Sequence, residues 1–500
     1  MQNVSSKNKK VFHPLLFSIF PILYIFTLNI DSLNPEEVIL PIILVPIVSI
    51  GLWSLLSLIL KNKYKSGMII SIGLILFFSY GHIHNILIDS EVTEDFSRHR
   101  YLVIPFVSIF LITTIYFVKT QKLLNNATTI TNGISIALLL MTLVNISSFA
   151  LTDTSMTLEN ESIFLPMTNT DSLPNVYYIF LDAYAGESVL NSVHNFDNSD
   201  FLTELELKDF QILDDANTNY AVTTHVMSSV LNMQYINEIG TKLGKDSKNV
   251  HPLYDLIKNN KVMKDFKSMG YEIIVLGSSH KFSTDISVAD EILCISNDPI
   301  NSEFNINLIK TSILKPIYSM LFETHRDKIL CSLSELPNVH NQFEKPIFVF
   351  SHLLLPHSPF IFGPNGEERI SKTIEVTDEW KAQGYVDQVK FTNKKMLEFL
   401  ESIPMDDQDP IIIIMGDHGT GATADINSDS KLIERMKILY ALRLPNSNVD
   451  LPDDMTPVNT FRLIFNEYFG SDYEYLENNS YLSSHDWPYN FTNVNNKLRP

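Results

Sequence analysis

Stretches of mostly apolar residues follow one another through the first 151 residues of the chain, separated by short polar segments. A helix that crosses a bilayer needs about 20 apolar residues, and each stretch meets or approaches that length. The pattern therefore predicts an N-terminal membrane region, residues 1–151, with about five transmembrane helices. The predicted spans cover roughly residues 11–30, 38–60, 68–88, 101–118 and 133–151.

The polar segments between these spans alternate in charge. Lysines gather before the first span, after the second and after the fourth, whereas the segments after the first and third spans are mainly acidic. Because Lys and Arg concentrate in cytoplasmic loops, we expect a multi-pass protein of the cell membrane with a cytoplasmic N-terminus. Everything after about residue 151 is then extracytoplasmic. A cleaved signal peptide is not expected, since further spans follow the first one and no small-residue cleavage site ends it.

Beyond the membrane region, residues 152–173 are polar and without a period, and they are predicted to form a linker. From residue 174 to residue 500, short apolar runs alternate with helical patterns, which predicts an α/β domain with a mostly parallel sheet. The strand-like runs are 175–181, 271–277, 346–354 and 410–416, and helical patterns include 200–210 and 252–270.

Acidic and imidazole side chains follow three of these runs. Asp182 follows the first run, His357 comes shortly after the third, and Asp417 and His418 follow the fourth. Open α/β sheets bind ligands at the carboxyl ends of their strands, and each of these side chains would be costly to bury without a partner. We therefore expect them to form a site at one edge of the sheet.

Thr223 is a further candidate. Apolar residues recur at helical spacing after Thr224, which places Thr223 near a helix start, where backbone N–H groups and the helix dipole favour a phosphate or an alkoxide. The alternative is that Thr223 or Thr224 simply caps the helix. His225 lies inside the same predicted helix, so we expect it to point toward the core rather than to act in catalysis.

A strand that ends in Asp182, a Thr near a helix start, HLLLPHSPF (352–360) and IIIIMGDHG (411–419) together resemble the alkaline phosphatase/sulfatase superfamily. The pattern is most similar to its membrane-anchored, sulfatase-like branch, which includes lipoteichoic acid synthases and phosphoethanolamine transferases. The resemblance covers about residues 174–500. It implies an alkaline-phosphatase-like α/β/α domain behind the membrane helices.

The resemblance also implies roles for individual residues. Asp182, Asp417 and His418 would be metal ligands, Thr223 the nucleophile and fourth ligand, and His357 a substrate-binding and catalytic residue. Such a donor set suits one divalent ion, Mn²⁺ or Zn²⁺, and a Thr hydroxyl needs that ion to become a good nucleophile.

Two departures from the family patterns narrow the expectation. Sulfatases carry Cys or Ser followed by x-Pro-x-Arg, whereas residues 223–227 read TTHVM, which disfavours a sulfatase. Two-metal phosphatases add an Asp-x-x-x-His pair and a late His, but no Asp lies four residues before His357, and His485 is the single His after His418. One metal is therefore preferred. His280, just after the run 271–277, is predicted to contact substrate, with an ordinary loop histidine as the alternative.

Composition limits the partners. The residues after position 150 carry a net charge of −23, which argues against a nucleic-acid partner because phosphate backbones require stripes of Lys and Arg. Cys294 and Cys331 are too few for a disulfide scaffold or a zinc cage, and either one bridge or two unpaired thiols is compatible with the sequence.

The favoured function is a metal-dependent membrane enzyme that transfers a phosphoryl-type head group through a Thr intermediate. Its donor would be a membrane lipid or lipid-linked substrate, and its acceptor an envelope glycan or lipid. The alternatives are a hydrolase of phosphate or sulfate esters from the same superfamily, and a membrane scaffold without catalytic activity.

Overall fold

The structure, a computed structural model, divides into two compact units. The first unit comprises Met1–Thr154 and Ser296–Glu323, and the second comprises Ser155–Ile295 and Thr324–Pro500. The predicted linker, 152–173, lies almost entirely outside the described residues and stays a prediction. The structure describes residues 9–30, 33, 35–89, 99–152, 173–295, 302–318, 325–344, 346–369, 377–403, 409–421, 423 and 426–498.

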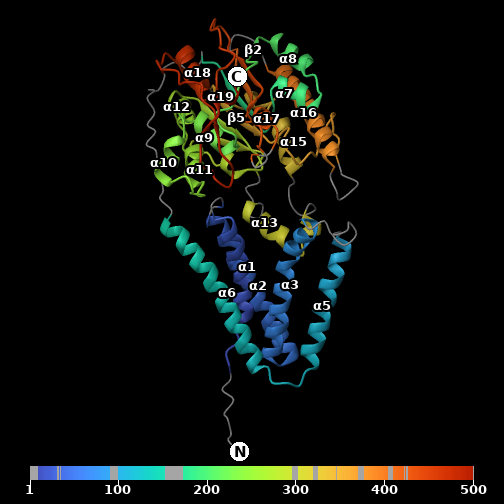
Figure 1. Cartoon of the computed structure of the whole chain (residues 1–500). Helices are drawn as coiled ribbons and strands as arrows, with labels where there is room; N and C mark the ends of the chain where they lie inside the picture. The colour runs from blue at the N-terminus through green and yellow to red at the C-terminus, as the bar shows by residue number, and fades with distance from the viewer. Residues whose placement is uncertain are drawn as a thin grey trace, which may run out of the picture. The chain divides into compact units, whose positions relative to one another are not determined.

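Long apolar helices form the first unit (Figure 1). Among the described residues, four segments are long and apolar enough to cross a membrane, and they confirm four of the predicted spans as candidates. The helix for the remaining span, α1, has 16 residues, or about 24 Å, against the ~30 Å of a hydrocarbon core, so this fifth crossing stays a prediction. The helices are α1 (His13–Leu28), α2 (Ile39–Leu60), α3 (Lys63–Asp89), α5 (His99–Lys119) and α6 (Asn125–Thr152).

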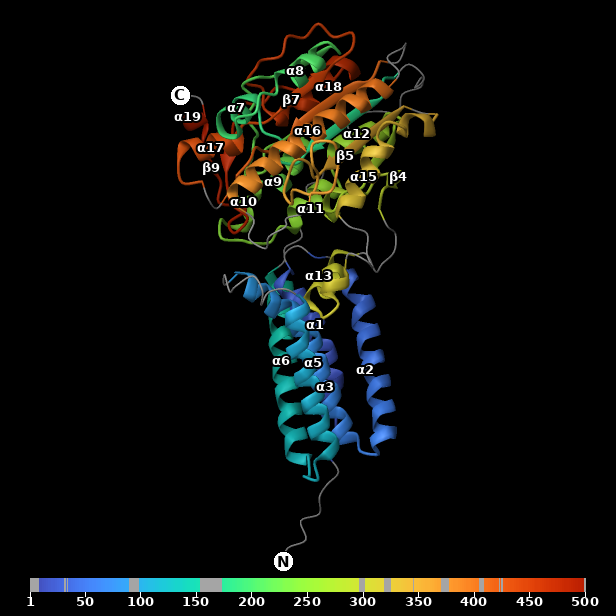
Figure 2. The same cartoon turned by 90° about the vertical axis from the view of Figure 1, so that its right-hand side faces the viewer.

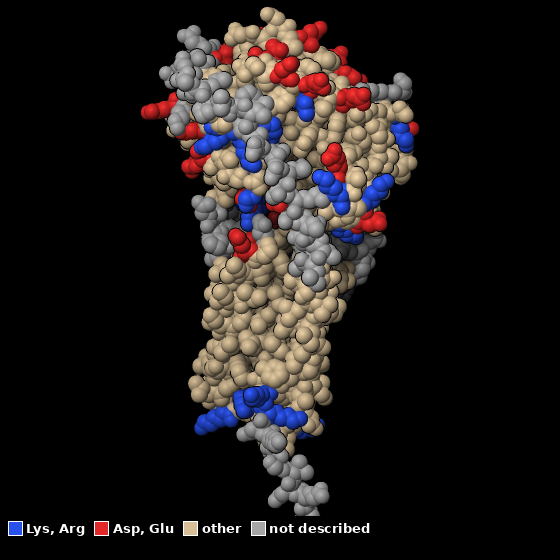
Figure 3. Space-filling view, turned by 90° about the vertical axis from the view of Figure 1, so that its left-hand side faces the viewer, with Lys and Arg blue, Asp and Glu red and all other residues tan. Residues whose placement is uncertain are grey.

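Lysines gather at one end of this unit. Lys9, just before α1, donates from Nζ to Thr129 Oγ1 at the start of α6, at 2.7 Å. Lys65, at the start of α3, donates to the Val118 carbonyl at the end of α5, at 2.9 Å. Figure 3 shows Lys and Arg side chains collected at this end, next to a long belt without charged side chains on the face it displays. The segments that the charge pattern assigns to the cytoplasm therefore meet at one end of the unit.

At the other end of α3, the unit includes a segment that lies between β4 and α15 in the chain (Figure 2). This insert consists of α13 (Glu303–Thr311) and η4 (Lys315–Ile317). The Phe304 N–H donates to Glu37 Oε2 at 3.0 Å, and the Ile313 N–H donates to the Phe77 carbonyl at 2.9 Å. Phe304 is fully buried in an apolar cluster with residues of α1 and α3. No pattern in the sequence predicts this packing.

Gly81 of α3 makes the close approach of α13 possible. A Cβ at this position would lie 2.2 Å from the Lys310 carbonyl oxygen and 2.5 Å from Thr311 Cα, which are both backbone atoms. Such a contact cannot be relieved by turning a side chain, so the insert would have to move.

The second unit contains a seven-stranded sheet in the order β2-β7-β6-β1-β5-β3-β4. β6, β1, β5, β3 and β4 are parallel, while β7 is antiparallel to both β6 and β2. The predicted strand runs are β1, β3, β5 and β6, four adjacent strands in the centre, which confirms the mostly parallel α/β prediction. The strands are β1 (Val176–Leu181), β2 (Phe210–Ile212), β3 (Glu272–Leu276), β4 (Glu291–Leu293), β5 (Ile347–Leu353), β6 (Ile411–Gly416) and β7 (Tyr440–Arg443).

Helices cover both faces of this sheet. Tyr178 and Phe180 of β1 belong to one apolar cluster, whereas Tyr177 and Ile179, which point the other way, belong to a second. The first cluster packs against α9 (Thr223–Val230), α11 (His251–Lys258), α12 (Lys261–Ser268) and α18 (Thr460–Phe469). The second packs against α7 (Glu187–His194), α8 (Ser199–Glu206), α15 (His325–Glu335) and α16 (Asp378–Ser402). Further helices are α10 (Asn237–Leu243), α17 (Asp429–Met436) and α19 (Asn495–Leu498).

Local details differ from the sequence patterns. The predicted helix 252–270 is two helices, because Asn260 leaves the helical conformation and its side chain accepts the Met263 N–H to cap α12. The predicted helix 200–210 ends at Glu206, and Phe210 begins β2. Cys294 and Cys331 form a disulfide, with Cα atoms 5.6 Å apart, which decides between the two alternatives that the sequence left open.

We predict that Gly81→Ala displaces the insert, because the added methyl group meets backbone of α13. In the purified full-length protein, trypsin should then cleave after Lys310 faster than in the wild type, as measured by mass spectrometry of the fragments. Gly51→Ala in α2 is the matched control, since a Cβ there meets no atom within 4 Å. Both changes raise helix propensity by about 1 kcal/mol, so equal cleavage rates in the two variants would contradict the prediction.

Candidate functional site

The register of the sheet brings three strand ends together. Leu181, the last residue of β1, pairs with Leu353 of β5 on one side and with Gly416 of β6 on the other. Asp182 and Asp417, the next residues after β1 and β6, therefore leave the sheet side by side. This is the carboxyl edge of a parallel sheet, where α/β proteins bind their ligands.

Asp182, Asp417 and His418 form a buried group whose ligand atoms all lie within 4.8 Å of one another. His418 Nε2 is 3.3 Å from Asp417 Oδ2 and 3.7 Å from Asp182 Oδ1. The three residues that the sequence nominated as metal ligands are thus close enough to bind one ion.

Hydrogen bonds fix both oxygens of Asp417. Oδ1 accepts the backbone N–H groups of Ala183 and His418, each at 2.8 Å. Oδ2 accepts the Thr223 hydroxyl at 2.6 Å. Ala183 has a φ of 64°, in the left-handed region that a non-glycine residue rarely adopts, and this conformation belongs to the turn that aims its N–H at Asp417.

His418 is held as a neutral ligand. Its Nδ1 lies 2.9 Å from the Gly419 carbonyl oxygen. A carbonyl can only accept, so Nδ1 carries the proton and Nε2 offers its lone pair toward the carboxylates. Burial lowers the pKa of His418 well below its usual value, with a further lowering by Arg435 and His357. A neutral imidazole is the form that binds a metal ion.

The environment of Asp182 tests whether the group fits a cation. Burial, and then the charge of Asp417, raise the pKa of the Asp182 carboxyl to about 7, against the opposing effects of His357 and Arg435. Its Oδ1 is buried and has no hydrogen-bond partner in the described part of the chain. A buried carboxylate oxygen in that state is expensive, and a divalent cation would both satisfy it and offset the repulsion. The donor set therefore fits a metal ion.

Thr223 is the first residue of α9, and Val222 occupies the cap position without a side-chain hydrogen bond. The Thr223 hydroxyl does not cap the helix but donates to Asp417, and Oγ1 lies 3.4 Å from His418 Nε2. The capping alternative for Thr223 or Thr224 is therefore wrong, because both residues lie inside the helix. The hydroxyl sits at the positive end of the helix dipole and inside the acidic group.

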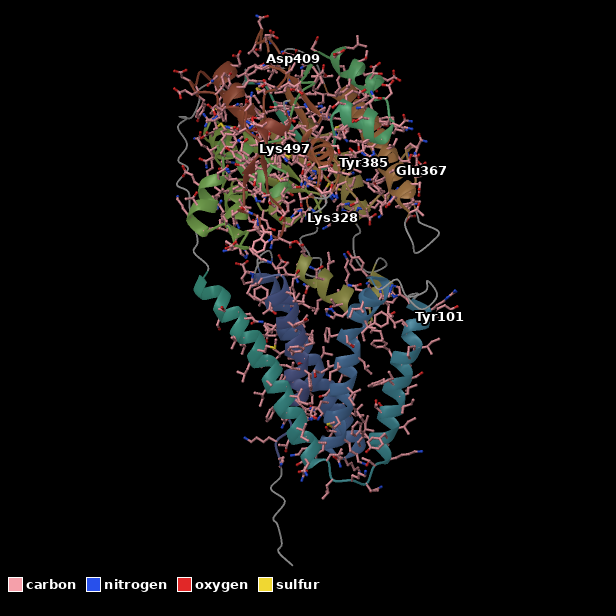
Figure 4. The ribbon with its side chains drawn as sticks, in the orientation of Figure 1. Tyr101, Lys328, Glu367, Tyr385, Asp409 and Lys497 are labelled. Carbon is pink, nitrogen blue, oxygen red and sulfur yellow. A yellow bond between two sulfur atoms is a disulfide. The ribbon has the colours of Figure 1, made fainter. Side chains whose placement is uncertain are left out.

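A cavity of about 360 Å³ lies beside the ends of β1 and β6: Ala183 and Thr420 line it, whereas Asp182, Thr223, Asp417 and His418 are not on its wall. His357 lines it, and its ring centroid is 6.4 Å from that of His418. The His357 Nδ1 donates to the Ser358 carbonyl oxygen at 2.5 Å. Other side chains on the wall come from distant parts of the chain: Tyr385 (labelled in Figure 4), Thr420, Arg435 and His485.

His280 neighbours His352, which in turn neighbours Asp182. Its ring centroid is 6.3 Å from that of His352, whose Nε2 is 3.8 Å from Asp182 Oδ2. Burial, with a smaller contribution from His357, lowers the pKa of His280 to about 4. His280 is not on the wall of the 360 Å³ cavity, so its contact with substrate stays a prediction.

Sequence reasoning missed Arg435 and Tyr385, because both lie within helices and follow no strand. His352 and His485 had weak signals, the first inside the segment HLLLPHSPF and the second as the last histidine of the chain. His225 is buried in α9, as expected, and its Nε2 donates to the Pro488 carbonyl oxygen at 2.8 Å. That bond connects α9 to the segment that carries His485.

Fold and site together define a class of protein: an α/β protein whose sheet edge carries two carboxylates, an imidazole and a helix-start hydroxyl suited to one metal ion. No family model and no curated protein matches the chain. Several solved structures are similar. One is the integral membrane lipooligosaccharide phosphoethanolamine transferase A from Neisseria meningitidis, with 11% identity over 91% of this chain and 94% of that chain and a TM-score of 0.42.

A second is the C-terminal periplasmic domain of EcEptC from Escherichia coli in complex with Zn, with 11% identity over 67% of this chain and 96% of that chain and a TM-score of 0.44. A third is a phosphonate monoester hydrolase of Agrobacterium radiobacter, with 10% identity over 62% of this chain and 80% of that chain and a TM-score of 0.40. Because the identities are near 10% and each TM-score is below 0.5, the activity has to be argued from the site itself.

We predict that Asp417→Asn removes most of the bound metal. The change deletes one charged ligand and leaves an amide whose NH₂ group cannot coordinate the ion. Zinc in the purified full-length protein, measured by elemental analysis after dialysis, should fall from about one equivalent to a small fraction. Asp409→Asn is the control, since Asp409 is a carboxylate outside the site that pairs with Arg443. Stoichiometric zinc in the Asp417 variant would contradict the assignment.

Proposed function

We propose that this chain is a metal-dependent membrane enzyme that moves a phosphoryl-type head group from a lipid donor to an envelope glycan or lipid acceptor, with Thr223 as the covalent carrier. The observation that carries the proposal is the Thr223 hydroxyl, 2.6 Å from Asp417 Oδ2 and inside the buried group of Asp182, Asp417 and His418. A helix-start hydroxyl used neither for capping nor for packing is suited to be a nucleophile.

Asp182, Thr223, Asp417 and His418 would hold one Zn²⁺ or Mn²⁺, and the bound ion would lower the pKa of the hydroxyl and offset charge on the phosphoryl oxygens. The protein groups prepare the same event. Asp417 Oδ2 accepts the hydrogen bond of the Thr223 hydroxyl, so the hydrogen points at the carboxylate and the lone pairs of Oγ1 point away from it. The N-terminus of α9 stabilises negative charge that develops on Oγ1.

In the first step, Thr223 Oγ1 bonds to the phosphorus of the donor, the bond from phosphorus to the lipid alcohol breaks, and the alcohol leaves with a proton. His357, on the cavity wall, is placed to hold a phosphoryl oxygen or to supply that proton. In the second step, the oxygen of an acceptor hydroxyl bonds to phosphorus, the bond from phosphorus to Thr223 Oγ1 breaks, and Oγ1 takes up a proton in exchange for the one that the acceptor gives up. Water in place of the acceptor would make the enzyme a hydrolase.

Three observations support an extracytoplasmic active site. Lysines of the first unit meet at one end of its helices. The insert, whose chain ends continue into the second unit, packs at the other end of α3. The Cys294–Cys331 disulfide is typical of an oxidising compartment. We infer that the N-terminus is cytoplasmic and that α1 completes five crossings.

We predict that an alkaline phosphatase reporter fused after residue 160 is active in intact cells, because that enzyme requires export to form its disulfides. A fusion after residue 122, in the lysine-containing segment before α6, should be inactive. A cytoplasmic reporter such as β-galactosidase should give the opposite pattern at both sites. Reporter activity only in the cytoplasm after residue 160 would disprove the topology.

We predict that Thr223→Ala lowers turnover by about three orders of magnitude or more, because the nucleophile is lost. Stability should fall by about 1 kcal/mol, the usual loss for one hydrogen bond. Thr223→Ser should keep part of the activity, since the oxygen remains. Thr224→Ala is the matched control: it removes the same side chain one position along α9 and should leave turnover close to wild type. Turnover is measured as release of lipid alcohol from phospholipid in detergent micelles.

Mass spectrometry of the same reactions distinguishes the mechanisms. Wild-type protein incubated with membrane lipids without an acceptor should carry an adduct on the peptide that contains Thr223, and its mass would identify the head group. Decay of the adduct in water alone at the rate of turnover would favour the hydrolase. Near wild-type turnover in Thr223→Ala would end the covalent mechanism.

A further inference from the structure

Arg435 of α17 is the buried cation of the cavity. Its residue is 6% exposed, and it lines the cavity together with His357 and His485. Within the described part of the chain, no carboxylate lies within the 4.0 Å of an ion pair with it. Burial lowers the pKa of its guanidinium to about 10, while the charges of Asp417 and Asp182 act against that lowering. The side chain is therefore charged at neutral pH, and those two carboxylates act on it from a distance.

Two carbonyl groups hold the guanidinium in place. Nε donates to the Ala221 carbonyl at 2.9 Å, and Nη1 donates to the Gly421 carbonyl at 2.6 Å. Ala221 is two residues before Thr223, and Gly421 is three residues after His418. Arg435 thus connects the segment of the nucleophile to the segment of the metal ligands. A guanidinium has five N–H groups, and the hydrogen bonds described for Arg435 leave both N–H groups of Nη2 available.

A second buried arginine in the same unit shows what a purely structural arrangement looks like. Arg443 of β7 is 5% exposed. Its Nε donates to the Lys208 carbonyl, Nη1 to the Pro410 carbonyl and Nη2 to Asp409 Oδ1, so all three nitrogens are bonded and the charge is paired. Arg435 differs in both respects, and it also faces a cavity.

The polar groups on the cavity wall indicate what kind of ligand the cavity would bind. One divalent cation would balance the carboxylates of Asp182 and Asp417. Arg435 and Asp486 both line the cavity, and the hydrogen bonds described for the guanidinium leave its Nη2 edge available. A negatively charged group with several oxygen acceptors would complete those hydrogen bonds. Phosphodiesters and sulfate monoesters are both tetrahedral anions of this kind.

Resting on the proposed function, we propose that Arg435 is the anion-binding catalytic residue of the pocket, whose Nη2 edge binds a non-bridging oxygen of the tetrahedral ester attacked by Thr223. The hydrogen bonds to the Ala221 and Gly421 carbonyls keep the guanidinium at a fixed position relative to Thr223 while the group is transferred.

The test uses the zinc-loaded full-length protein in detergent, with bis(p-nitrophenyl) phosphate as substrate and inorganic phosphate as competitive inhibitor. Arg435→Lys keeps the charge but loses the planar fork, and Arg435→Met loses both. We expect the inhibition constant of phosphate to rise about tenfold or more in Arg435→Met and by a smaller factor in Arg435→Lys. Added methylguanidinium should partly restore Arg435→Met. Arg443→Lys is the matched control, and its phosphate inhibition should equal that of the wild type.

The outcomes separate the two proposals. Unchanged phosphate inhibition in both Arg435 variants, or a loss of turnover with bound zinc and KM unaltered, would make Arg435 a structural link and overturn the inference. p-Nitrophenyl sulfate turned over in preference to the phosphodiester, with the same dependence on Arg435, would support the anion site but contradict phosphoryl transfer. A zinc-loaded wild type that neither binds phosphate nor turns over either ester would overturn the proposed function and this inference with it.

Discussion

The Asp417 carboxylate is the group on which the arrangement of the site depends. One oxygen is fixed by the N–H groups of Ala183 and His418, and the other receives the Thr223 hydroxyl. These contacts join the ends of β1 and β6 to the start of α9, three segments that are far apart in the chain. Because backbone donors orient Oδ1, the carboxylate is held with Oδ2 toward the Thr223 hydroxyl. The parallel register of β1 and β6 thus places the group that accepts the hydrogen bond of the nucleophile.

The same arrangement has an energetic cost that the fold tolerates. Two carboxylates and an imidazole are buried within a few ångströms of one another, and one carboxylate oxygen has no hydrogen-bond partner among the described residues. Burial, and then the charge of Asp417, raise the pKa of Asp182 and so oppose its ionised form. Central strands with both faces packed hold these residues in place, since β1, β5 and β6 are fully buried along their length. The sheet therefore prevents the carboxylates from moving apart, and a bound cation would gain free energy by offsetting their repulsion.

The sequence predicts the features of the fold and the site that depend on patterns of neighbouring residues. Long apolar runs are typical of buried parallel strands, so the sequence predicts β1, β3, β5 and β6. It also identifies the residues directly after these strands, such as Asp182 and Asp417, as site candidates. β2 and β4 have three residues each, too few for a pattern. Arg435 and Tyr385 reach the cavity from helix interiors, and a polar residue there is ordinarily a solvent-facing one. Their placement depends on how α16 and α17 pack, and no local pattern encodes it.

The insert shows the same limit on a larger scale. Residues 296–323 lie between elements of the second unit in the chain but belong to the first unit by their contacts. Phe304 and Leu308 of α13 are buried against Ile22, Ile25 and Phe78, which are residues of α1 and α3. A fragment cut at residue 174, the boundary that composition suggests, would lack both helices and expose that apolar face to water. The disulfide between Cys294 and Cys331 joins the two chain ends of the insert, so this face would remain attached to the fragment. The segment 174–500 is therefore continuous in sequence, but the apolar face of α13 within it is covered only when α1 and α3 are present.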